Sequence, residues 1–236
     1  MDIAQVRQIN QIKMDITNAV MKAFEDHFGN EFYCAGGAPR DWYFDKPVND
    51  IDLYTDNNSP TSAYGKALAN LTVNGNRMTI DSIQDIESKY IGMDNDAIRK
   101  VYRIQLSRRD SSGRMDGFNK VDIIQMKKLN GGFNDIFASY DYDMCMIGYK
   151  DGYYHPSIAF ENFEKSGATT IKKNRLTKEA LLKNGERVHF PKIEAKYPGI
   201  KLEANPSLVD YFEGTKVKEL LYTSDVMVEL QKTVNL

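Results

Sequence analysis

A short series of motifs in the first quarter of the chain limits the possible fold most strongly. Glu31–Ala35 is typical of a short strand that ends in Gly36-Gly37, and Ile51–Tyr54 alternates apolar and polar residues as a second strand does. Between them, Asp41–Phe44 suits a helical turn that is broken before Pro47. The chain is therefore expected to pass from a strand through a glycine turn and a short helix into another strand.

The residues on either side of these motifs predict two further helices. Apolar residues at steps of three and four predict one long helix over Ile3–Phe28, which Gly29-Asn30 would stop. The predicted buried stripe of this helix consists of Ile9, Ile12, Ile16, Val20 and Phe24. A second helix is expected from Ser59-Pro60 to about Leu71.

Several strands are expected after the second helix, and they define the fold class. They are predicted at Arg77–Ile80, Lys100–Leu106, Lys120–Met126 and Met144–Tyr149. Ser111–Gly117 has the composition of a turn, which predicts that the strands on either side of it form a hairpin. Because strands follow one another without a helix between each pair, an α+β fold with a mixed sheet is favoured over a regular βαβ array.

The composition of the chain changes after Pro156, where lysine and glutamate become more frequent. A domain boundary is therefore placed near residue 160, between a head domain at residues 1–160 and a basic, mainly helical region at residues 161–236. Helical pieces are expected in the second region at Asn174–Lys183, Leu208–Phe212 and Val217–Leu230.

The charge of the chain is uneven along its length. A net charge of -2 gives no global reason to expect nucleic acid as a partner. Locally, residues 99–114 carry six basic residues against one acidic residue, and residues 165–201 carry ten against three. Each segment suits contact with a polyphosphate or an RNA backbone, and each also suits a solvated face.

The two cysteines, Cys34 and Cys145, lie in apolar, strand-like runs without the C-x-x-C spacing of a metal site. Both are expected to be buried thiols of a cytoplasmic protein. The chain begins without an apolar signal segment, and no run approaches the ~18 apolar residues that a membrane span needs. A soluble protein without a membrane partner is expected.

Paired aspartates carry the first indication of chemistry. Asp50 and Asp52 stand two apart on a predicted strand, so both carboxylates point to the same face. Hard carboxylate oxygens are the ligands that Mg²⁺ prefers. A two-metal site generally needs a third carboxylate from a neighbouring strand, and Asp122 is the best candidate because its strand is otherwise apolar. Alternatively, the pair lies on a surface strand and Asp122 on an edge strand.

Gly36 and Gly37 follow the first strand and would let backbone N–H groups approach phosphates without an intervening Cβ atom. Arg40 follows within reach of a phosphate or of the carboxylates. A glycine pair by itself is more often only a turn. The combination of glycines, arginine and aspartates in this order predicts a site for a nucleoside triphosphate and magnesium.

At these residues the sequence resembles a known family. Gly36-Gly-Ala-Pro-Arg-Asp41 followed by Asp50-Ile-Asp52 is similar to the signature of the head domain of class II tRNA nucleotidyltransferases and bacterial poly(A) polymerases, in the DNA polymerase beta-like nucleotidyltransferase superfamily. The resemblance is specific over Phe32–Thr55 and looser to about Gly148. It implies a polymerase beta-like head fold.

The resemblance also implies roles for individual residues. Gly36 and Gly37 would hold the triphosphate, and Asp50 and Asp52 would bind two Mg²⁺ ions. Asp122 matches the third strand carboxylate of the superfamily and would help to activate the incoming hydroxyl group.

Two parts of the chain depart from the family. The family segment Arg-Arg-Asp-Phe-Thr-Ile-Asn-Ala corresponds to Ser139-Tyr-Asp-Tyr-Asp-Met-Cys-Met146, in which Asp141 matches the aspartate and is assigned to nucleotide binding, whereas both arginines and the asparagine are absent. The Glu-Asp-x-x-Arg element that selects the base is not recognisable, and the region after the head is shorter than the family's neck, body and tail. Nucleotide choice and tRNA recognition therefore do not carry over.

The leading hypothesis is a Mg²⁺-dependent nucleotidyltransferase that moves a nucleotide from a nucleoside triphosphate to a hydroxyl group, with an RNA 3′ end, foremost that of tRNA, as the acceptor. Arg175 is the basic residue assigned to the nucleotide, in a segment that equally suits a solvated helix face. Nucleotidyl transfer to a protein or small molecule is the enzymatic alternative. A catalytically silent nucleotide- or RNA-binding module is the alternative outside enzymes.

Overall fold

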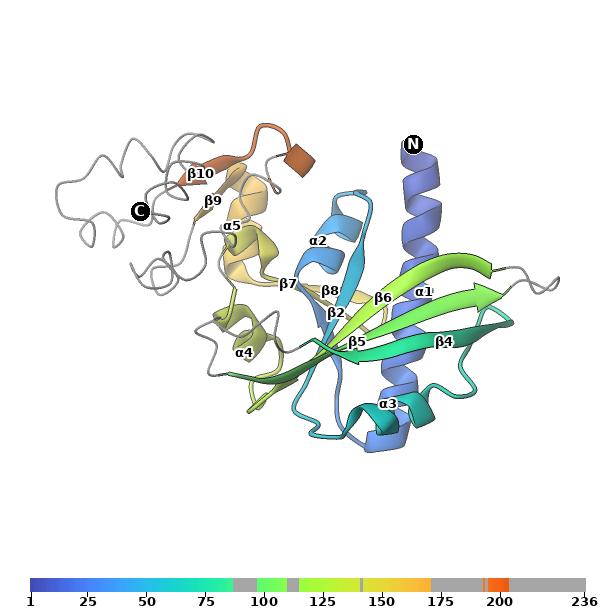
Figure 1. Cartoon of the computed structure of the whole chain (residues 1–236). Helices are drawn as coiled ribbons and strands as arrows, with labels where there is room; N and C mark the ends of the chain where they lie inside the picture. Colours follow the sequence, from blue (N-terminus) through green and yellow to red (C-terminus); the bar gives the residue numbers. More distant parts are fainter. Residues whose placement is uncertain (87–96, 110–114, 141, 171–192, 194, 204–236) are drawn as a thin grey trace, which may run out of the picture. The chain divides into compact units, whose positions relative to one another are not determined.

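A computed structural model describes residues 1–86, 97–109, 115–140, 142–170, 193 and 195–203, which form an α+β fold with a mixed β-sheet, as predicted (Figure 1). The helices of these residues are α1 (Ile3–Phe28), α2 (Gly37–Tyr43), α3 (Thr61–Ala67), α4 (Phe133–Ala138), the 3-10 helix η2 (Asp143–Cys145) and α5 (Ile158–Ser166). The strands are β1 (Tyr33–Ala35), β2 (Asp50–Thr55), β3 (Thr72–Val73), β4 (Asn76–Asp85), β5 (Ile98–Arg109), β6 (Met115–Met126), β7 (Ile147–Lys150), β8 (Tyr153–Pro156), β9 (Ala168–Thr170) and β10 (Lys201–Glu203). In this part of the chain, no helix is both long and apolar enough to cross a membrane.

The elements form two compact units. The first contains α1 to α4 with the strands β1 to β7 and most of β8, and the second contains η2, α5, β9 and β10. In the second unit, β9 and β10 pair in parallel, and the η2 residue Asp143 accepts hydrogen bonds from the backbone N–H and the hydroxyl group of Thr170. The helical pieces predicted at residues 174–183, 208–212 and 217–230 lie outside the described residues.

Local signals at both ends explain the length of α1. Asp2 forms a capping box with Gln5, in which the Asp2 carboxylate accepts from the Gln5 N–H at 2.8 Å. Gly29 ends the helix in the left-handed conformation at φ 72°, where it donates its N–H to the Glu25 carbonyl. The predicted bounds of this helix are confirmed.

The predicted buried stripe of α1 is wrong at its N-terminal end. Ile9 is 41% exposed, whereas Asn10 and Thr17 are buried. The amide group of Asn10 donates to the Lys46 carbonyl at 3.0 Å, and the Thr17 hydroxyl donates to the Lys13 carbonyl at 2.8 Å. These hydrogen bonds allow Asn10 and Thr17 to lie on the buried side of α1, although the Asn10 Oδ1 atom is buried without a hydrogen-bond partner among the described residues.

The first unit contains one sheet with the strand order β3-β4-β5-β6-β2-β1-β7-β8. β2 and β6 are parallel, whereas β1–β2, β1–β7, β4–β5 and β5–β6 are antiparallel. The antiparallel pairing of β5 and β6 confirms the predicted hairpin, although both strands are longer than predicted and β6 includes Met115–Gly117 of the expected turn. β6, which carries Asp122, lies in the interior of the sheet.

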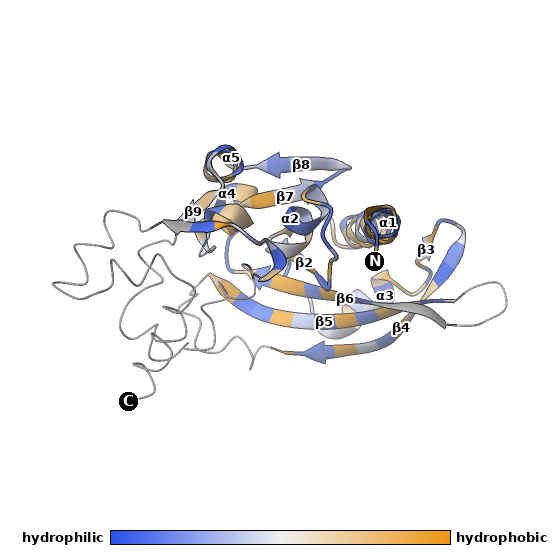
Figure 2. Ribbon diagram, turned by 90° about the horizontal axis from the view of Figure 1, so that it is seen from above, coloured by the Kyte–Doolittle hydropathy of each residue, from blue (hydrophilic) through white to orange (hydrophobic). Residues whose placement is uncertain are grey.

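The main core covers one face of the central strands. Alternate residues of β2, β5 and β6 are buried together with the apolar residues of α1 and α3. Members of this core include Ile51, Leu53, Val121, Ile123 and Ile104 from the strands, and Val20, Phe24, Tyr64 and Leu68 from the helices. Figure 2 shows the resulting alternation of apolar and polar segments along β5 and β6. The opposite face of these strands carries the polar residues Asp52, Arg103 and Asp122 next to the buried apolar residues Val101 and Ile124.

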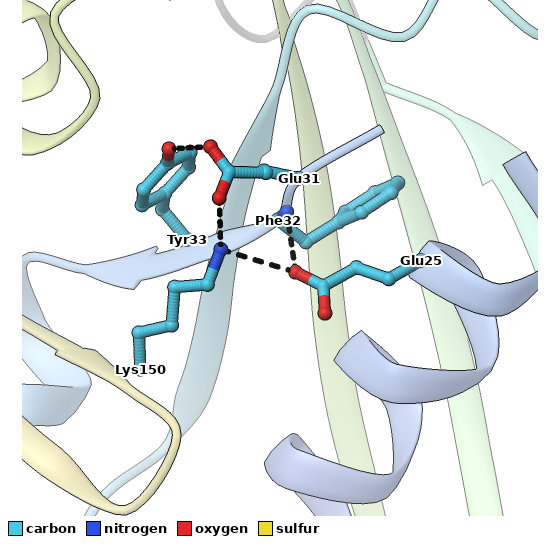
Figure 3. A network of polar contacts seen from close by, with 5 residues as sticks. All are labelled: Glu25, Glu31, Phe32, Tyr33 and Lys150. Atoms are coloured by element: carbon cyan, nitrogen blue, oxygen red, sulfur yellow. Dashed lines mark hydrogen bonds and ion pairs between the residues drawn. The ribbon is translucent and has the colours of Figure 1, made fainter. Parts of the chain in front are cut away.

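A polar network fastens β1 between α1 and β7 (Figure 3). The Lys150 ammonium group lies 3.1 Å from a Glu31 carboxylate oxygen and 3.3 Å from one of Glu25. Glu25 also accepts the backbone N–H of Phe32 at 3.0 Å, and the Tyr33 hydroxyl donates to Glu31. Hydrogen bonds from Tyr33 and Lys150 lower the pKa of Glu31, so this carboxylate stays ionised. The network holds the strand that leads directly into Gly36.

Two predicted elements have different bounds in the structure. The strand predicted at Met144–Tyr149 is wrong in its first half, because Cys145 and Met146 donate their N–H groups to carbonyls three residues earlier and so form η2. Met144 and Met146 are nevertheless buried, whereas Cys145 is only partly buried, contrary to its prediction. The helix predicted to extend to about Leu71 ends at Ala67, since β3 begins at Thr72.

Gly148 provides a test of packing beside β1. It pairs with Ala35, and a Cβ atom at this position would lie 2.0 Å from the Phe133 ring. Gly148→Ala is therefore expected to reduce the free energy of unfolding by about 1–3 kcal/mol, measured by urea denaturation, because the ring must move. Gly65→Ala in α3 is the control, since its nearest neighbour is the end of Ile83 at 3.3 Å. Equal stability of both variants would show that the Phe133 ring relocates without cost.

Candidate active site

Three aspartates lie on adjacent strands at the polar face of the sheet. The parallel register of β2 and β6 places Asp52 opposite Asp122 and Asp50 opposite Lys120. Residues that pair across two strands point to the same face, and alternate residues of one strand share a face. Asp50, Asp52 and Asp122 therefore lie on one face of the sheet, the one opposite the core of α1 and α3.

Burial increases from one aspartate to the next. Asp50 is exposed, Asp52 is half-buried, and Asp122 is 1% exposed. Burial raises the pKa of Asp52 well above its ordinary value, repulsion from Asp50 and Asp122 raises it further, and the positive charge of Arg103 opposes both effects. Burial and the neighbouring carboxylates therefore disfavour the ionised form of Asp52, which a cation bound beside it would stabilise.

Arg103 of β5 completes the row of side chains. The antiparallel register of β5 and β6 places Arg103 opposite Asp122, as Asp52 lies opposite Asp122 on the other side. Arg103 Nε lies 2.7 Å from Asp122 Oδ1, and Arg103 Nη2 lies 2.6 Å from Asp122 Oδ2. This two-pronged contact is the geometry in which guanidinium and carboxylate groups bind most strongly.

Arg103 was not among the predicted site residues and is one of the six basic residues in the segment 99–114. The available signal was a charged residue inside the apolar run of Val101 to Leu106, which requires an anionic partner when the strand is buried. Identifying that partner as Asp122 needs the register of the hairpin, which the turn residues did not define. The contact between Arg103 and Asp122 could therefore be recognised only from the structure, in which the two strands are aligned.

Two of the three aspartates, Asp50 and Asp52, are suited to hold a divalent cation. Among the described residues, no group of three or more His, Cys, Asp and Glu side chains is arranged to hold one metal ion together. Asp122 directs both oxygens at Arg103, whereas within the same residues no hydrogen bond or ion pair engages the carboxylates of Asp50 and Asp52. Mg²⁺ is usually held by one or two carboxylates, with phosphate oxygens and water completing its shell. Asp50 and Asp52 match that requirement.

The glycine pair lies where β1 passes into α2. Gly36 has φ 91° and ψ -128°, a conformation that other residues adopt only with strain, and its N–H donates to the Ile147 carbonyl at 3.3 Å. Gly37 is the first residue of α2, and a Cβ atom there would meet only Arg40 Nη2, at 3.8 Å. Backbone conformation therefore explains the glycine at position 36, whereas neither conformation nor packing requires one at position 37.

Arg40 lies in the same helix, and the structure pairs it with its neighbour. Its Nε and Nη2 atoms lie 2.9 and 2.8 Å from Asp41 Oδ1, and both side chains are buried. The guanidinium group also lies beside Gly37, because a Cβ atom on Gly37 would be 3.8 Å from Arg40 Nη2. The structure thus brings Arg40 to the glycine turn.

Two predicted nucleotide-binding residues, Asp141 and Arg175, lie outside the described residues. Of the predicted site, the structure therefore places Gly36, Gly37 and Arg40 at the turn after β1, and Asp50, Asp52 and Asp122 on the polar face of β2 and β6.

Comparison with known proteins relates the fold to a class of enzymes. No protein-family model and no curated protein matches the sequence significantly. Among solved structures, a tRNA-processing enzyme in its apo form I has a TM-score of 0.53 at 13% identity, covering 94% of this chain and 56% of that chain. A CCA-adding enzyme in complex with ATP has a TM-score of 0.52 at 12% identity, covering 98% and 50%. A CCA-adding enzyme of Bacillus stearothermophilus in complex with CTP has a TM-score of 0.50 at 11% identity, covering 92% and 47%.

The chain therefore has a tRNA nucleotidyltransferase-like fold, which confirms at the level of fold the resemblance seen around Gly36–Asp52. It spans about half the length of the solved proteins that it matches. At these identities the likeness concerns the fold alone, so the chemistry of this chain has to be argued from its own residues.

Proposed function

We propose that the chain is a Mg²⁺-dependent nucleotidyltransferase, which moves a nucleoside monophosphate from a nucleoside triphosphate to an acceptor hydroxyl group and releases pyrophosphate. The observation that carries the proposal is the row of Asp50, Asp52 and Asp122 on one face of a nucleotidyltransferase-like sheet, with Asp50 exposed at its end. Clustered carboxylates repel one another and lower stability, which a protein tolerates where they serve a function.

Asp50 and Asp52 are the residues that would hold the cation. When bound there, Mg²⁺ would neutralise the triphosphate and make the acceptor hydroxyl group more acidic. The half-buried position of Asp52 fixes its side chain on the strand, while the exposed Asp50 leaves room for substrate oxygens. Together they would orient the reacting phosphate towards the sheet.

Gly36, Gly37 and Arg40 would hold the triphosphate. The N–H of Gly36 already donates to Ile147, so the N–H of Gly37 is the better donor for a phosphate oxygen. Glycine at position 37 allows that approach without a Cβ atom, and no requirement of packing explains it otherwise. Arg40, held by Asp41, would add a positive charge beside the same turn.

An RNA 3′ end, foremost that of tRNA, is the proposed acceptor. Similar solved structures are described as tRNA-processing and CCA-adding enzymes, and the basic segments of this chain suit an RNA backbone. Asp141 and Arg175 remain proposed nucleotide contacts on the basis of sequence alone. A catalytically silent nucleotide-binding module is the second candidate, and it is favoured by the Arg103 contact that neutralises Asp122.

A labelling assay tests the proposal. The purified chain, incubated with Mg²⁺ and each of four α-³²P-labelled nucleoside triphosphates, is expected to label RNA from a cell extract, and EDTA is expected to abolish the label. Separation of RNA, protein and small molecules shows which acceptor is used. Label on protein or on a small molecule would contradict the RNA acceptor, and binding of nucleotide without any transfer would support the silent module instead.

A further inference from the structure

The contact between Arg103 and Asp122 lies inside the carboxylate cluster, at the centre of the sheet. Asp52, Asp122 and Arg103 occupy directly paired positions on β2, β6 and β5. The guanidinium group contacts both oxygens of Asp122, at 2.7 and 2.6 Å. Any cation that used Asp122 as a ligand would therefore lie close to this positive charge.

Burial makes the contact persistent. The Asp122 side chain is 1% exposed and that of Arg103 is 20% exposed, so water screens the pair far less than it screens a surface ion pair. Separating such a pair removes a strong attraction between two poorly screened charges, which is unfavourable. In the protein without nucleotide, Asp122 is therefore committed to Arg103.

Strand pairing alone does not account for these two charges. β5 and β6 already pair through their backbones from Ile98 to Arg109, and apolar residues at the two positions would join the same strands at least as well. The position of Asp122 and Arg103 beside Asp50 and Asp52 offers a reason for the two charges, because a positive charge there offsets part of the repulsion among the three carboxylates. Asp50, Asp52, Asp122 and Arg103 together carry a net formal charge of two negative charges, and the exposed Lys120, which pairs with Asp50 across the strands, adds one positive charge at the edge of the row.

We propose that Arg103 is a positioning residue that keeps Asp122 out of the metal-binding set of the nucleotide-free protein, so that Asp50 and Asp52 take one divalent cation and not two. This inference rests on the proposed function, because it assumes that these aspartates bind metal. The number of bound ions would then depend on Arg103, which holds Asp122 and is not itself a metal ligand.

Counting bound Mn²⁺ tests the inference without an activity measurement. The intact chain without nucleotide is titrated with Mn²⁺, and free Mn²⁺ is followed by electron paramagnetic resonance. One ion per chain is expected for the unaltered protein. Arg103→Gln is expected to bind Mn²⁺ about tenfold more tightly or to bind a second ion, because the positive charge beside the carboxylates is removed and Asp122 no longer directs both oxygens at a guanidinium group. Arg103→Lys keeps the charge and is expected to bind one ion.

A double variant separates this role from a purely structural one. Arg103→Gln combined with Asp122→Asn is expected to return to one ion with the affinity of the unaltered protein, whereas a structural defect of Arg103→Gln would persist. Two ions in the unaltered chain, or unchanged binding in Arg103→Gln, would overturn the inference, and the unaltered chain gives this answer even if Arg103→Gln does not fold. Transfer of label by a chain that binds two ions would leave the proposed function standing, so the two failures are distinguishable.

Discussion

Asp52→Asn is expected to stop nucleotidyl transfer and, at the same time, to stabilise the metal-free protein. The variant keeps the shape of the side chain but removes the charge that would hold the cation. Loss of a residue that only supports a metal ligand typically costs 10–100-fold, so loss of a direct ligand is expected to lower transfer by more than about a hundredfold. The labelling assay measures this effect at saturating nucleotide.

The gain in stability follows from the raised pKa of Asp52. In the unfolded chain an aspartate titrates near about 3.9, whereas burial and the neighbouring carboxylates raise the pKa in the folded protein. Below pH about 4 the group is protonated in both states, and its cost to the folded state appears as the pH rises through the higher folded pKa. Thermal unfolding in EDTA is therefore expected to show a higher midpoint for Asp52→Asn at pH 7 and little difference at pH 4.

Asp26→Asn is the matched control, because Asp26 is 64% exposed and forms only a surface ion pair with Lys22. It is expected to change neither transfer nor stability. Asp50→Asn should lose transfer with a smaller gain in stability, since Asp50 is exposed. A fully active Asp52→Asn variant would remove Asp52 from the metal site, and a variant less stable in EDTA would show that its carboxylate is compensated in the folded protein.

The second large effect is expected at the centre of the core. Phe24 of α1 is 0% exposed, and its ring centroid lies 5.0 Å from that of Phe32 and 5.2 Å from that of Tyr64. Phe24→Ala removes the contacts of α1 with Phe32, which directly precedes β1, and with Tyr64 of α3, and leaves a cavity. The free energy of unfolding is expected to fall by about 3–5 kcal/mol, measured by urea denaturation.

Ile9→Ala tests the same helix at a position that the apolar pattern also assigned to the core. Ile9 is 41% exposed, so its replacement is expected to change the free energy of unfolding by about 0.5 kcal/mol or less. A loss in the free energy of unfolding as large for Ile9→Ala as for Phe24→Ala would mean that the Ile9 side chain is buried in solution. A small loss at Phe24 would mean that the aromatic residues around it close the cavity.

Features governed by neighbours in the chain were predictable from the sequence. The end of α1 at Gly29 was predicted, because capping depends on groups within one helical turn; the capping box of Asp2 and Gln5 was not predicted, although it is equally local. The strand carrying Asp50 and Asp52 was recognised from alternation, and the β5–β6 hairpin from the turn composition between its strands. The glycine turn at Gly36-Gly37 before α2 was predicted from the sequence for the same reason, because it depends on neighbouring residues.

Features that depend on distant partners were not predictable in this way. Asn10 replaced Ile9 on the buried line of α1 because the Lys46 carbonyl, 36 residues away, accepts its amide hydrogen. Arg103 entered the site because the register of β5 and β6 sets it opposite Asp122. The local pattern of apolar residues contains no information on the hydrogen-bond partner of Asn10 or on the register of β5 and β6.

The pattern of residues along the chain is enough to predict an α+β domain with a mixed sheet and to place Asp50 and Asp52 on one face of a strand, since alternate residues of a strand share a face. How the charges of the site pair with one another depends on the assembled sheet. Asp122 lies beside Asp52 as expected, yet its two oxygens contact Arg103. Coulomb interactions depend on distance in space and on burial, and both are established only when the strands assemble into the sheet.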